Sequence, residues 1–168
     1  FDMMKLQNDN YNLQAAESLQ LMLSLLDTVS LKGEERRIAE ALGYWDFFNN
    51  RESMEASYYE AWWETMLDLT FDEFRKENVS LAMPNDFSVI LIMKSNPGFS
   101  FFDKLDTPEK ETLKEIVNEA FQKSVAAIRE WEAQKHQPAQ WADYKDTYIQ
   151  HLLQMEPLSH HPRIGGNS

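Results

Sequence analysis

The chain has 168 residues, of which 43% are hydrophobic and 12% aromatic, so we expect an ordered domain with a sizeable core rather than a disordered segment. Its 16 Lys and Arg residues against 28 Asp and Glu residues give a net charge of −12, which argues against nucleic acid and anionic membranes as partners. It has no cysteine, which excludes disulfides and thiolate chemistry, and no apolar run near the ~20 residues that cross a bilayer.

Two helices are predicted in the first part of the chain. Residues 13–27 carry apolar side chains at helical spacing, namely Ala16, Leu19, Leu23 and Leu26. Residues 34–49 are expected to form the second helix, with an apolar side made of Ile38, Ala41, Leu42, Trp45 and Phe48.

A third helix is predicted to begin at Ser53, because Glu55 and Glu60 place negative charge near its positive N-terminal end. Its apolar positions form two adjacent rows, Tyr58, Trp62, Met66 and Leu69 and then Tyr59, Trp63 and Leu67. Thr70 is expected to cap a short helix that contains Phe71 and Phe74.

Residues 83–98 contain an apolar run between two breaks. The strings Met83-Pro84-Asn85-Asp86 and Asn96-Pro97-Gly98 are typical of a chain break and a turn. The run between them, at residues 87–93, has no clear period, so a buried helix and a strand fit it equally well.

The clearest predicted element is a long helix that ends near Gln134. The string Thr107-Pro108-Glu109 has the order of an N-cap, a proline at the first helical position and an acid in the first turn. Its core-facing side is marked by Leu113, Ile116, Val117, Ala120, Phe121, Ser124, Ile128 and Trp131. Glu119 and Lys123 stand one turn apart and are expected to pair on its outer side.

Beyond Pro138 the pattern becomes irregular, and Pro157, Pro162 and Gly165-Gly166 predict an extended path. We therefore divide the chain into a helical body, residues 1–137, and an extended return segment, residues 138–168, which leads toward a core sheet outside this chain. The predicted fold class is mainly α, an irregular bundle of about five to six helices with an extended C-terminal tail.

The four histidines do not form a metal-binding pattern. No two of them have the one-turn helical spacing of a zinc site, and no acidic residue completes a ligand set. We expect exposed loop side chains at His136, His151, His160 and His161.

Carboxylate pairs such as Asp68 with Asp72, or Asp103 with Asp106, are expected to be solvated faces rather than acid–base pairs. The sequence has no Gly-x-Ser-x-Gly elbow, phosphate loop or dinucleotide fingerprint. The string Asn78-Val79-Ser80 fits a glycosylation acceptor. We therefore predict no catalytic, cofactor-binding or metal-binding residue in the chain.

Aromatic residues are concentrated in one part of the sequence. At helical spacing they favour a core or a docking face for a neighbouring lobe over a private ligand pocket. The cluster consists of Trp45, Phe47, Phe48, Tyr58, Tyr59, Trp62 and Trp63.

Ordered strings along nearly the whole chain resemble the penicillin acylase (penicillin amidase) family of N-terminal nucleophile hydrolases. The first part of the resemblance lies in Leu6-Gln7-Asn8-Asp9 with Leu13 and Ala16, in residues 42–46, and in Ser53, Ala56 and Ala61-Trp62-Trp63. The second part lies in Phe101-Phe102-Asp103 with Thr107 and Glu111, and in Trp141, Ile149, His151-Leu152, Pro157 and Gly165-Gly166. Phe47 and Lys104 depart from the family pattern, and the stretch around Trp141 lacks a second Trp and Gly.

The resemblance implies a parent enzyme that cleaves an amide bond with the newly exposed N-terminal residue of its large chain. It places that nucleophile, the oxyanion hole and the calcium ligands before Phe1, so none is carried onto residues here. This segment would then be a lobe of an αββα enzyme, without a cofactor, in the periplasm or secreted. Its partners would be the small chain and the core of the large chain.

Two other functions stay open at this point. An independent helical interaction module could dock a partner through the Tyr58–Trp63 aromatic face. A small helical enzyme with an unrecognised carboxylate site ranks last, because no motif supports it. The abrupt first residues and the terminal Gly165-Gly166 string favour the excised lobe.

Overall fold

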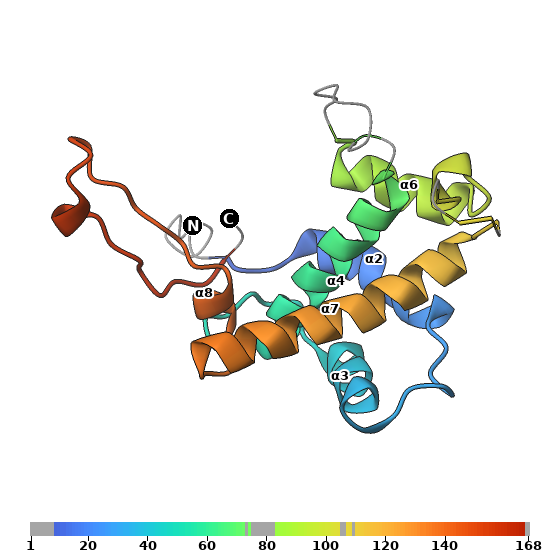
Figure 1. The fold of residues 1–168 in the computed structure, drawn as a ribbon, viewed down its shortest axis with the longest axis horizontal. Helices are drawn as coiled ribbons and strands as arrows, with labels where there is room; N and C mark the ends of the chain where they lie inside the picture. The colour runs from blue at the N-terminus through green and yellow to red at the C-terminus, as the bar shows by residue number, and fades with distance from the viewer. Residues whose placement is uncertain (1–8, 73, 75–82, 105–106, 109, 167–168) are drawn as a thin grey trace, which may run out of the picture.

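The computed structural model describes residues 9–166 except 73, 75–82, 105–106 and 109. The described part is an irregular helical bundle (Figure 1), and its only β-type pairings are two isolated antiparallel bridges. Its α-helices are α2 (Leu13–Leu25), α3 (Gly33–Tyr44), α4 (Met54–Thr70), α6 (Asp86–Ser95), α7 (Leu113–Lys135) and α8 (Trp141–Tyr144). Two short 3₁₀ turns, η1 (Ser100–Phe102) and η2 (Glu156–Leu158), complete the list. The predicted mainly α class is confirmed.

Helices α4 and α7 cross at the centre of the bundle, and α2, α3 and α6 surround them (Figure 1). The Trp62 indole Nε1 of α4 donates a 2.9 Å hydrogen bond to the carbonyl oxygen of Val117 in α7. The Trp62 ring also meets the Phe121 ring edge to face, with centroids 4.9 Å apart. Because the indole N–H is satisfied at the contact, the largest side chain of the core is buried there without an orphan donor.

The aromatic rows of α4 form the core, as their helical spacing predicts. Tyr59, Trp62 and Trp63 are each at most 2% exposed, and Tyr58 is 7% exposed. The Tyr59 hydroxyl lies 2.9 Å from the Ser18 hydroxyl of α2, which joins two helices through a buried polar contact. The helix therefore packs on more than one side, which explains its two apolar rows.

Capping residues set two helix starts, of which the sequence predicts the one at Ser53. The Ser53 hydroxyl accepts the Ala56 N–H and begins α4, and the Asn85 side chain accepts the Phe87 N–H and begins α6. The ambiguous run at residues 87–93 is therefore a helix. The long helix ends at Lys135, one residue beyond the predicted end, and His136 then adopts a left-handed backbone with φ 56°.

The predicted start of the long helix is wrong. Helix α7 begins at Leu113, where Thr112 and Glu115 form a capping box. The Thr107 hydroxyl instead donates a 2.6 Å hydrogen bond to Glu111. The Thr112 and Glu115 side chains adjoin the first turn of α7, so they set its start in place of the more distant Thr107-Pro108 string. The predicted Glu119–Lys123 pair is present, with Nζ and Oε1 2.8 Å apart.

Two other boundaries differ from the prediction. Helix α3 ends at Tyr44 rather than at Asn49, because Trp45 is extended, with φ −65° and ψ 137°. Thr70 is the last residue of α4 and not the N-cap of a separate helix. The rest of that predicted short helix falls mostly on residues 73 and 75–82, outside the described residues, as does the Asn78-Val79-Ser80 string.

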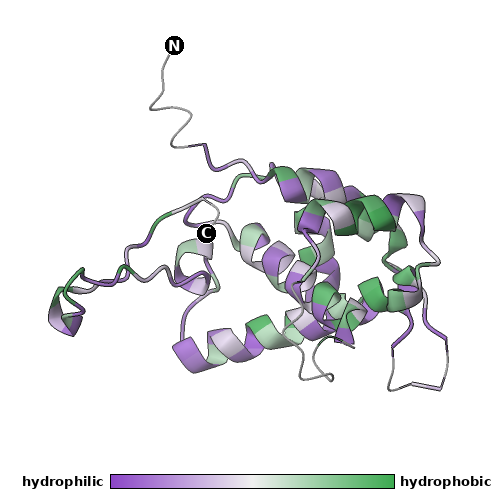
Figure 2. Cartoon of the chain, turned by 90° about the horizontal axis from the view of Figure 1, so that it is seen from above, coloured by the Kyte–Doolittle hydropathy of each residue, from purple (hydrophilic) through white to green (hydrophobic). Residues whose placement is uncertain are grey.

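The chain beyond Pro138 first packs on the body and then leaves it. Ala139, Trp141 and Ala142 are buried, and α8 is a helical turn that the sequence did not predict. Residues 147–160 then project from the body as an arm (Figures 1 and 2). The extended tail is thus observed, whereas the domain division at residue 138 stays a prediction.

Replacing Phe121 by alanine is expected to lower the free energy of unfolding by about 3–5 kcal/mol, because a ring that is 1% exposed leaves the α4–α7 contact. Urea unfolding followed by circular dichroism measures the change. The neighbouring Gln122 is exposed, so Gln122→Ala should alter stability by less than about 0.5 kcal/mol. Equal losses in both variants would contradict a central role for this contact.

Candidate functional site

Three segments that are distant in sequence meet beside α8, in an arrangement that we call the junction. The loop of residues 45–53 lies between the incoming segment, residues 9–12, and the outgoing segment, residues 165–166. The carbonyl of Phe47 accepts the Asn12 N–H at 2.7 Å, and the Asn49 N–H donates to Asn10 at 2.9 Å. The carbonyl of Asn49 accepts the Gly166 N–H at 2.8 Å. The helical body thus has its incoming and outgoing segments fastened to one loop.

The loop of residues 45–53 has an unusual local shape that makes this pairing possible. Phe47 has φ 64°, in the left-handed region that costs an ordinary residue roughly 1–2 kcal/mol. The Asp46 carboxylate accepts the Phe48 N–H at 3.0 Å, and the Trp45 indole donates to the Phe48 carbonyl at 3.3 Å. These side-chain contacts hold the turn that presents Phe47 and Asn49 to their backbone partners.

The outgoing segment approaches so closely that residue 165 has to be glycine. A Cβ atom there would lie 2.7 Å from the Asn49 carbonyl oxygen and 3.0 Å from the Asn10 amide nitrogen. The Gly166 carbonyl accepts hydrogen bonds from the Trp141 indole at 2.8 Å and from Lys145 Nζ at 3.0 Å. Helix α8 is pinned in turn, since the Trp141 N–H donates to the Ser53 carbonyl at 2.9 Å.

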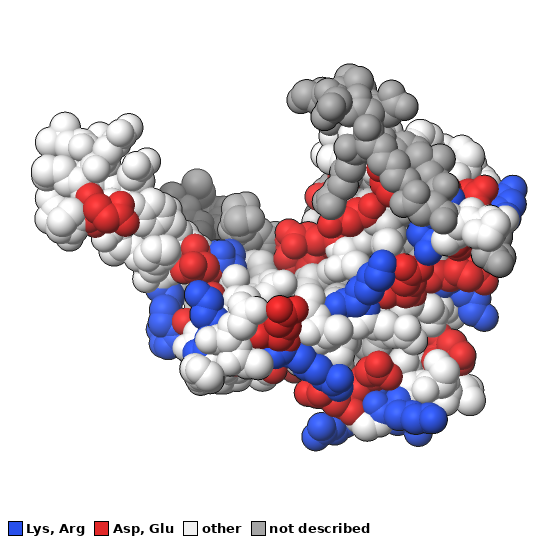
Figure 3. Space-filling view, viewed as in Figure 1, with Lys and Arg blue, Asp and Glu red and all other residues white. Residues whose placement is uncertain are grey.

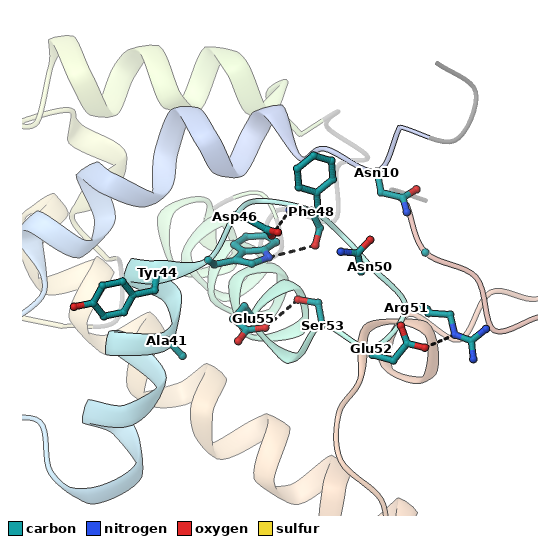
Figure 4. Close-up of a pocket in the computed structure, with 12 residues that line it drawn as sticks. Asn10, Ala41, Tyr44, Asp46, Phe48, Asn50, Arg51, Glu52, Ser53 and Glu55 are labelled. Carbon is teal, nitrogen blue, oxygen red and sulfur yellow. Dashed lines mark hydrogen bonds and ion pairs between the residues drawn. The ribbon is translucent and has the colours of Figure 1, made fainter. Parts of the chain in front are cut away.

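A groove of about 860 Å³ opens at the junction (Figure 4). Its walls mix aromatic, amide and charged side chains, and an Arg51–Glu52 ion pair of 2.5 Å lies on one side. The Ser53 hydroxyl donates to Glu55 at 3.1 Å and caps α4, so it serves the helix. The groove offers hydrogen-bonding and apolar contacts but no activated nucleophile. Its lining comprises Asn10, Ala41, Tyr44, Trp45, Asp46, Phe48, Asn50, Arg51, Glu52, Ser53, Glu55 and Gly165.

The histidines do not meet at one place. His161 Nδ1 lies 2.7 Å from an Asp146 carboxylate oxygen, His160 pairs through its backbone with Ile149, and His136 ends α7. Among the described residues, no group of three or more His, Asp or Glu side chains could hold a metal ion.

The expectation that Asp68 with Asp72, and Asp103 with Asp106, are solvated faces stays a prediction. One Asp103 oxygen accepts the Glu111 N–H at 3.2 Å and so orders the approach to α7. Asp106 lies outside the described residues.

An acidic cluster that the sequence reading did not single out lies on α4. Burial, together with the charges of Glu64 and Asp86, raises the pKa of Glu60 to about 7. Asp86 accepts the Trp63 indole N–H at 3.1 Å. Burial also raises the pKa of Tyr144, with Glu64 and Glu60 contributing, which places α8 beside this cluster. The one-turn spacing of Glu60 and Glu64 indicates in the sequence that these two side chains are neighbours. No local pattern indicates that Asp86 approaches them.

The proposed Tyr58–Trp63 docking face is wrong. These four aromatic side chains are at most 7% exposed and pack inside the chain, so they cannot receive a partner. Among the described residues, no hydrogen bond joins a serine or threonine hydroxyl to a histidine ring. The junction groove and the exposed arm are two surfaces that remain accessible.

These features describe a helical bundle with a groove at the junction and a projecting arm. The model of the penicillin amidase family matches residues 1–168, the whole length, and the chain belongs to that family. No curated protein and no solved structure matches the chain. Within the described residues, no helix is long and apolar enough to cross a membrane.

Gly165→Ala is expected to cost about 1–3 kcal/mol, because its methyl group would collide with the Asn49 carbonyl and push the outgoing segment off the loop. Hydrogen exchange of the Gly166 amide should become faster in the variant. Gly98 has open space around its Cα, so Gly98→Ala is the matched control and should leave that exchange unchanged. Unaltered protection in the Gly165 variant would refute the close approach.

The raised pKa of Glu60 makes the chain less stable as the pH rises. The folded state binds this proton more tightly than the unfolded state, so its contribution is full below pH 4.5 and is lost toward about pH 7. Glu60→Gln should therefore increase the free energy of unfolding at pH 8 by on the order of 1–3 kcal/mol. Urea titrations at several pH values measure it. Glu40→Gln, at an exposed site, should leave the pH profile unchanged.

Proposed function

We propose that the chain is a non-catalytic helical lobe of a penicillin-acylase-like hydrolase, and that it docks on the catalytic part of that enzyme. The parent would hydrolyse an amide bond of an acylated small molecule, such as a β-lactam or an acyl-homoserine lactone. Family membership over the whole length supports the first part. Acyl transfer of this type needs an activated nucleophile, which we assign to a part of the enzyme outside this chain.

The observation that carries the proposal is the junction. The incoming and outgoing segments pair with one loop through Asn10, Asn12 and Gly166, so the helical body closes on itself at a single point. A lobe whose two connecting segments lie side by side can be attached to a larger protein at a single place. Domain insertions are tolerated where chain ends lie close together for the same reason.

Exposed apolar side chains on the arm supply a second argument. Leu152 is 97% exposed, Leu153 74% and Leu158 53%, so three leucines of the arm present their side chains to solvent. Contiguous exposed apolar residues mark interaction sites. We assign them to contact with the small chain and the core of the large chain. No nucleic acid, membrane or cofactor enters this proposal, and the location would be periplasmic or secreted.

Catalytic competence is tested first on the purified chain. It is expected to hydrolyse neither a chromogenic phenylacetyl anilide nor an acyl-homoserine lactone above the buffer rate. In the parent reading frame, a Ser, Thr or Cys behind a spacer is expected upstream of this segment. Turnover by the chain alone would overturn the proposal.

Docking is tested by binding the chain to the catalytic part of the parent, produced separately and followed by calorimetry. Leu152→Asp should weaken the affinity at least about tenfold, or about 1.4 kcal/mol, because it places a charge on the apolar tip. Val29 is 85% exposed on the body, so Val29→Asp is the matched control and should bind with the affinity of the unsubstituted chain. Equal affinity of both variants would remove the arm from the interface.

A further inference from the structure

The arm leaves the helical body through a narrow neck. Two described backbone hydrogen bonds, of 2.9 and 3.1 Å, join Ile149 to His160 and make the arm a closed loop. Inside it, the Ser159 hydroxyl accepts the His151 N–H at 2.9 Å, and the Tyr148 hydroxyl donates to Glu156 at 3.0 Å. The described hydrogen bonds of residues 147–160 stay within the arm. Its internal shape is therefore fixed, and its direction has to be set at the neck.

One ion pair and one histidine–carboxylate contact cross the neck. Arg163 on the returning strand lies 2.6 Å from the Asp143 carboxylate of α8 and donates a 2.9 Å hydrogen bond to Gln140. His161 Nδ1, closer to the arm, lies 2.7 Å from Asp146. Each contact joins the segment that leads into the arm, residues 143–146, to the segment that returns from it, residues 161–163.

The neck is anchored on a rigid part of the body. Asp143 belongs to α8, whose Ala142 N–H donates to the Arg51 carbonyl at 3.0 Å. Asp146 has φ 48°, a left-handed backbone that turns the chain away from α8. The Tyr148 ring lies 4.9 Å from the His161 ring and covers the second pair on one side. The two contacts thus connect α8 and the residues just after it to the segment that returns from the arm.

We propose that the Asp143–Arg163 and Asp146–His161 pairs form a clamp that holds the arm in its projecting direction. Exposed ion pairs add little to global stability. The described hydrogen bonds of the arm itself, residues 147–160, are all internal, so contacts at the neck have to set its direction. A modest restraint at the neck then decides which direction is populated. The hollow between the arm and the helices, seen in Figure 3, is kept open by this restraint.

The test uses the absence of cysteine, which allows site-specific labelling without background. Spin labels are attached at Leu152→Cys on the tip and at Ala126→Cys, an exposed position of α7. Pulsed electron–electron double resonance then reports the distribution of distances between the label on the tip and the label on the body. The otherwise unchanged chain should give one narrow distribution. In Asp143→Asn combined with Asp146→Asn, the width should increase at least about twofold, as it should for the unchanged chain in ~1 M salt, which screens exposed pairs.

Two comparisons separate the clamp from a general structural effect. Exchanging the charges with Asp143→Arg and Arg163→Asp should restore a distribution narrower than that of the double Asn variant. Glu17→Gln, which removes the exposed Lys94–Glu17 pair on the body, should leave it unchanged.

The clamp would be overturned if the double Asn variant gave a distance distribution as narrow as that of the unsubstituted chain. Equal broadening in the Glu17 control would also overturn it. If loss of Asp143 unfolds the chain, Asp146→Asn with His161→Gln takes its place, since both side chains are more than half exposed. This outcome does not depend on the proposed docking, because no partner is present in the sample.

Discussion

The contact between α4 and α7 is the interaction on which the rest of the molecule depends. Trp62 fills the crossing point, and its indole N–H is satisfied by the Val117 carbonyl. A buried ring of this size without that bond would leave a costly orphan donor. With the crossing fixed, α2 can reach Tyr59 through Ser18 on one side of α4. On the other end of the same helix, Ser53 both caps α4 and receives the Trp141 N–H, which positions α8.

The surfaces suited to docking lie away from this core and are attached to it at one end. The junction fastens both extended segments to residues 45–53, next to the N-terminus of α4. The arm begins immediately after α8, whose position is fixed by the same loop. A rigid helical body thereby supports a groove and a protruding arm. For this member of the penicillin amidase family, the arrangement is the basis of the proposed role as a supporting lobe.

Charge is distributed in accordance with that division. Part of the acidic excess lies on the outer face of α4, where partial burial and mutual repulsion raise the pKa of Glu60. Most of the described ion pairs, in contrast, join separate elements, such as Arg129 with Glu34 and Lys104 with Glu119. Lys104 is 15% exposed and ties the segment before α7 to the helix itself. The paired charges orient elements, whereas the partly buried carboxylate of Glu60 makes the free energy of unfolding depend on pH.

The sequence by itself determined the mainly α class, the buried rows of α4, the core-facing side of α7 and the start of α4 at Ser53. These features depend on side chains within a few residues of one another, so their spacing is visible in the sequence. Only the tertiary structure decided that α3 stops at Tyr44, that α7 starts at Leu113 and that Trp141 begins α8. It also decided that Gly165 meets Asn49 and that Asp86 approaches Glu60. Backbone pairing and charge proximity between distant residues leave no local periodicity, because the chain has to fold before those groups can meet.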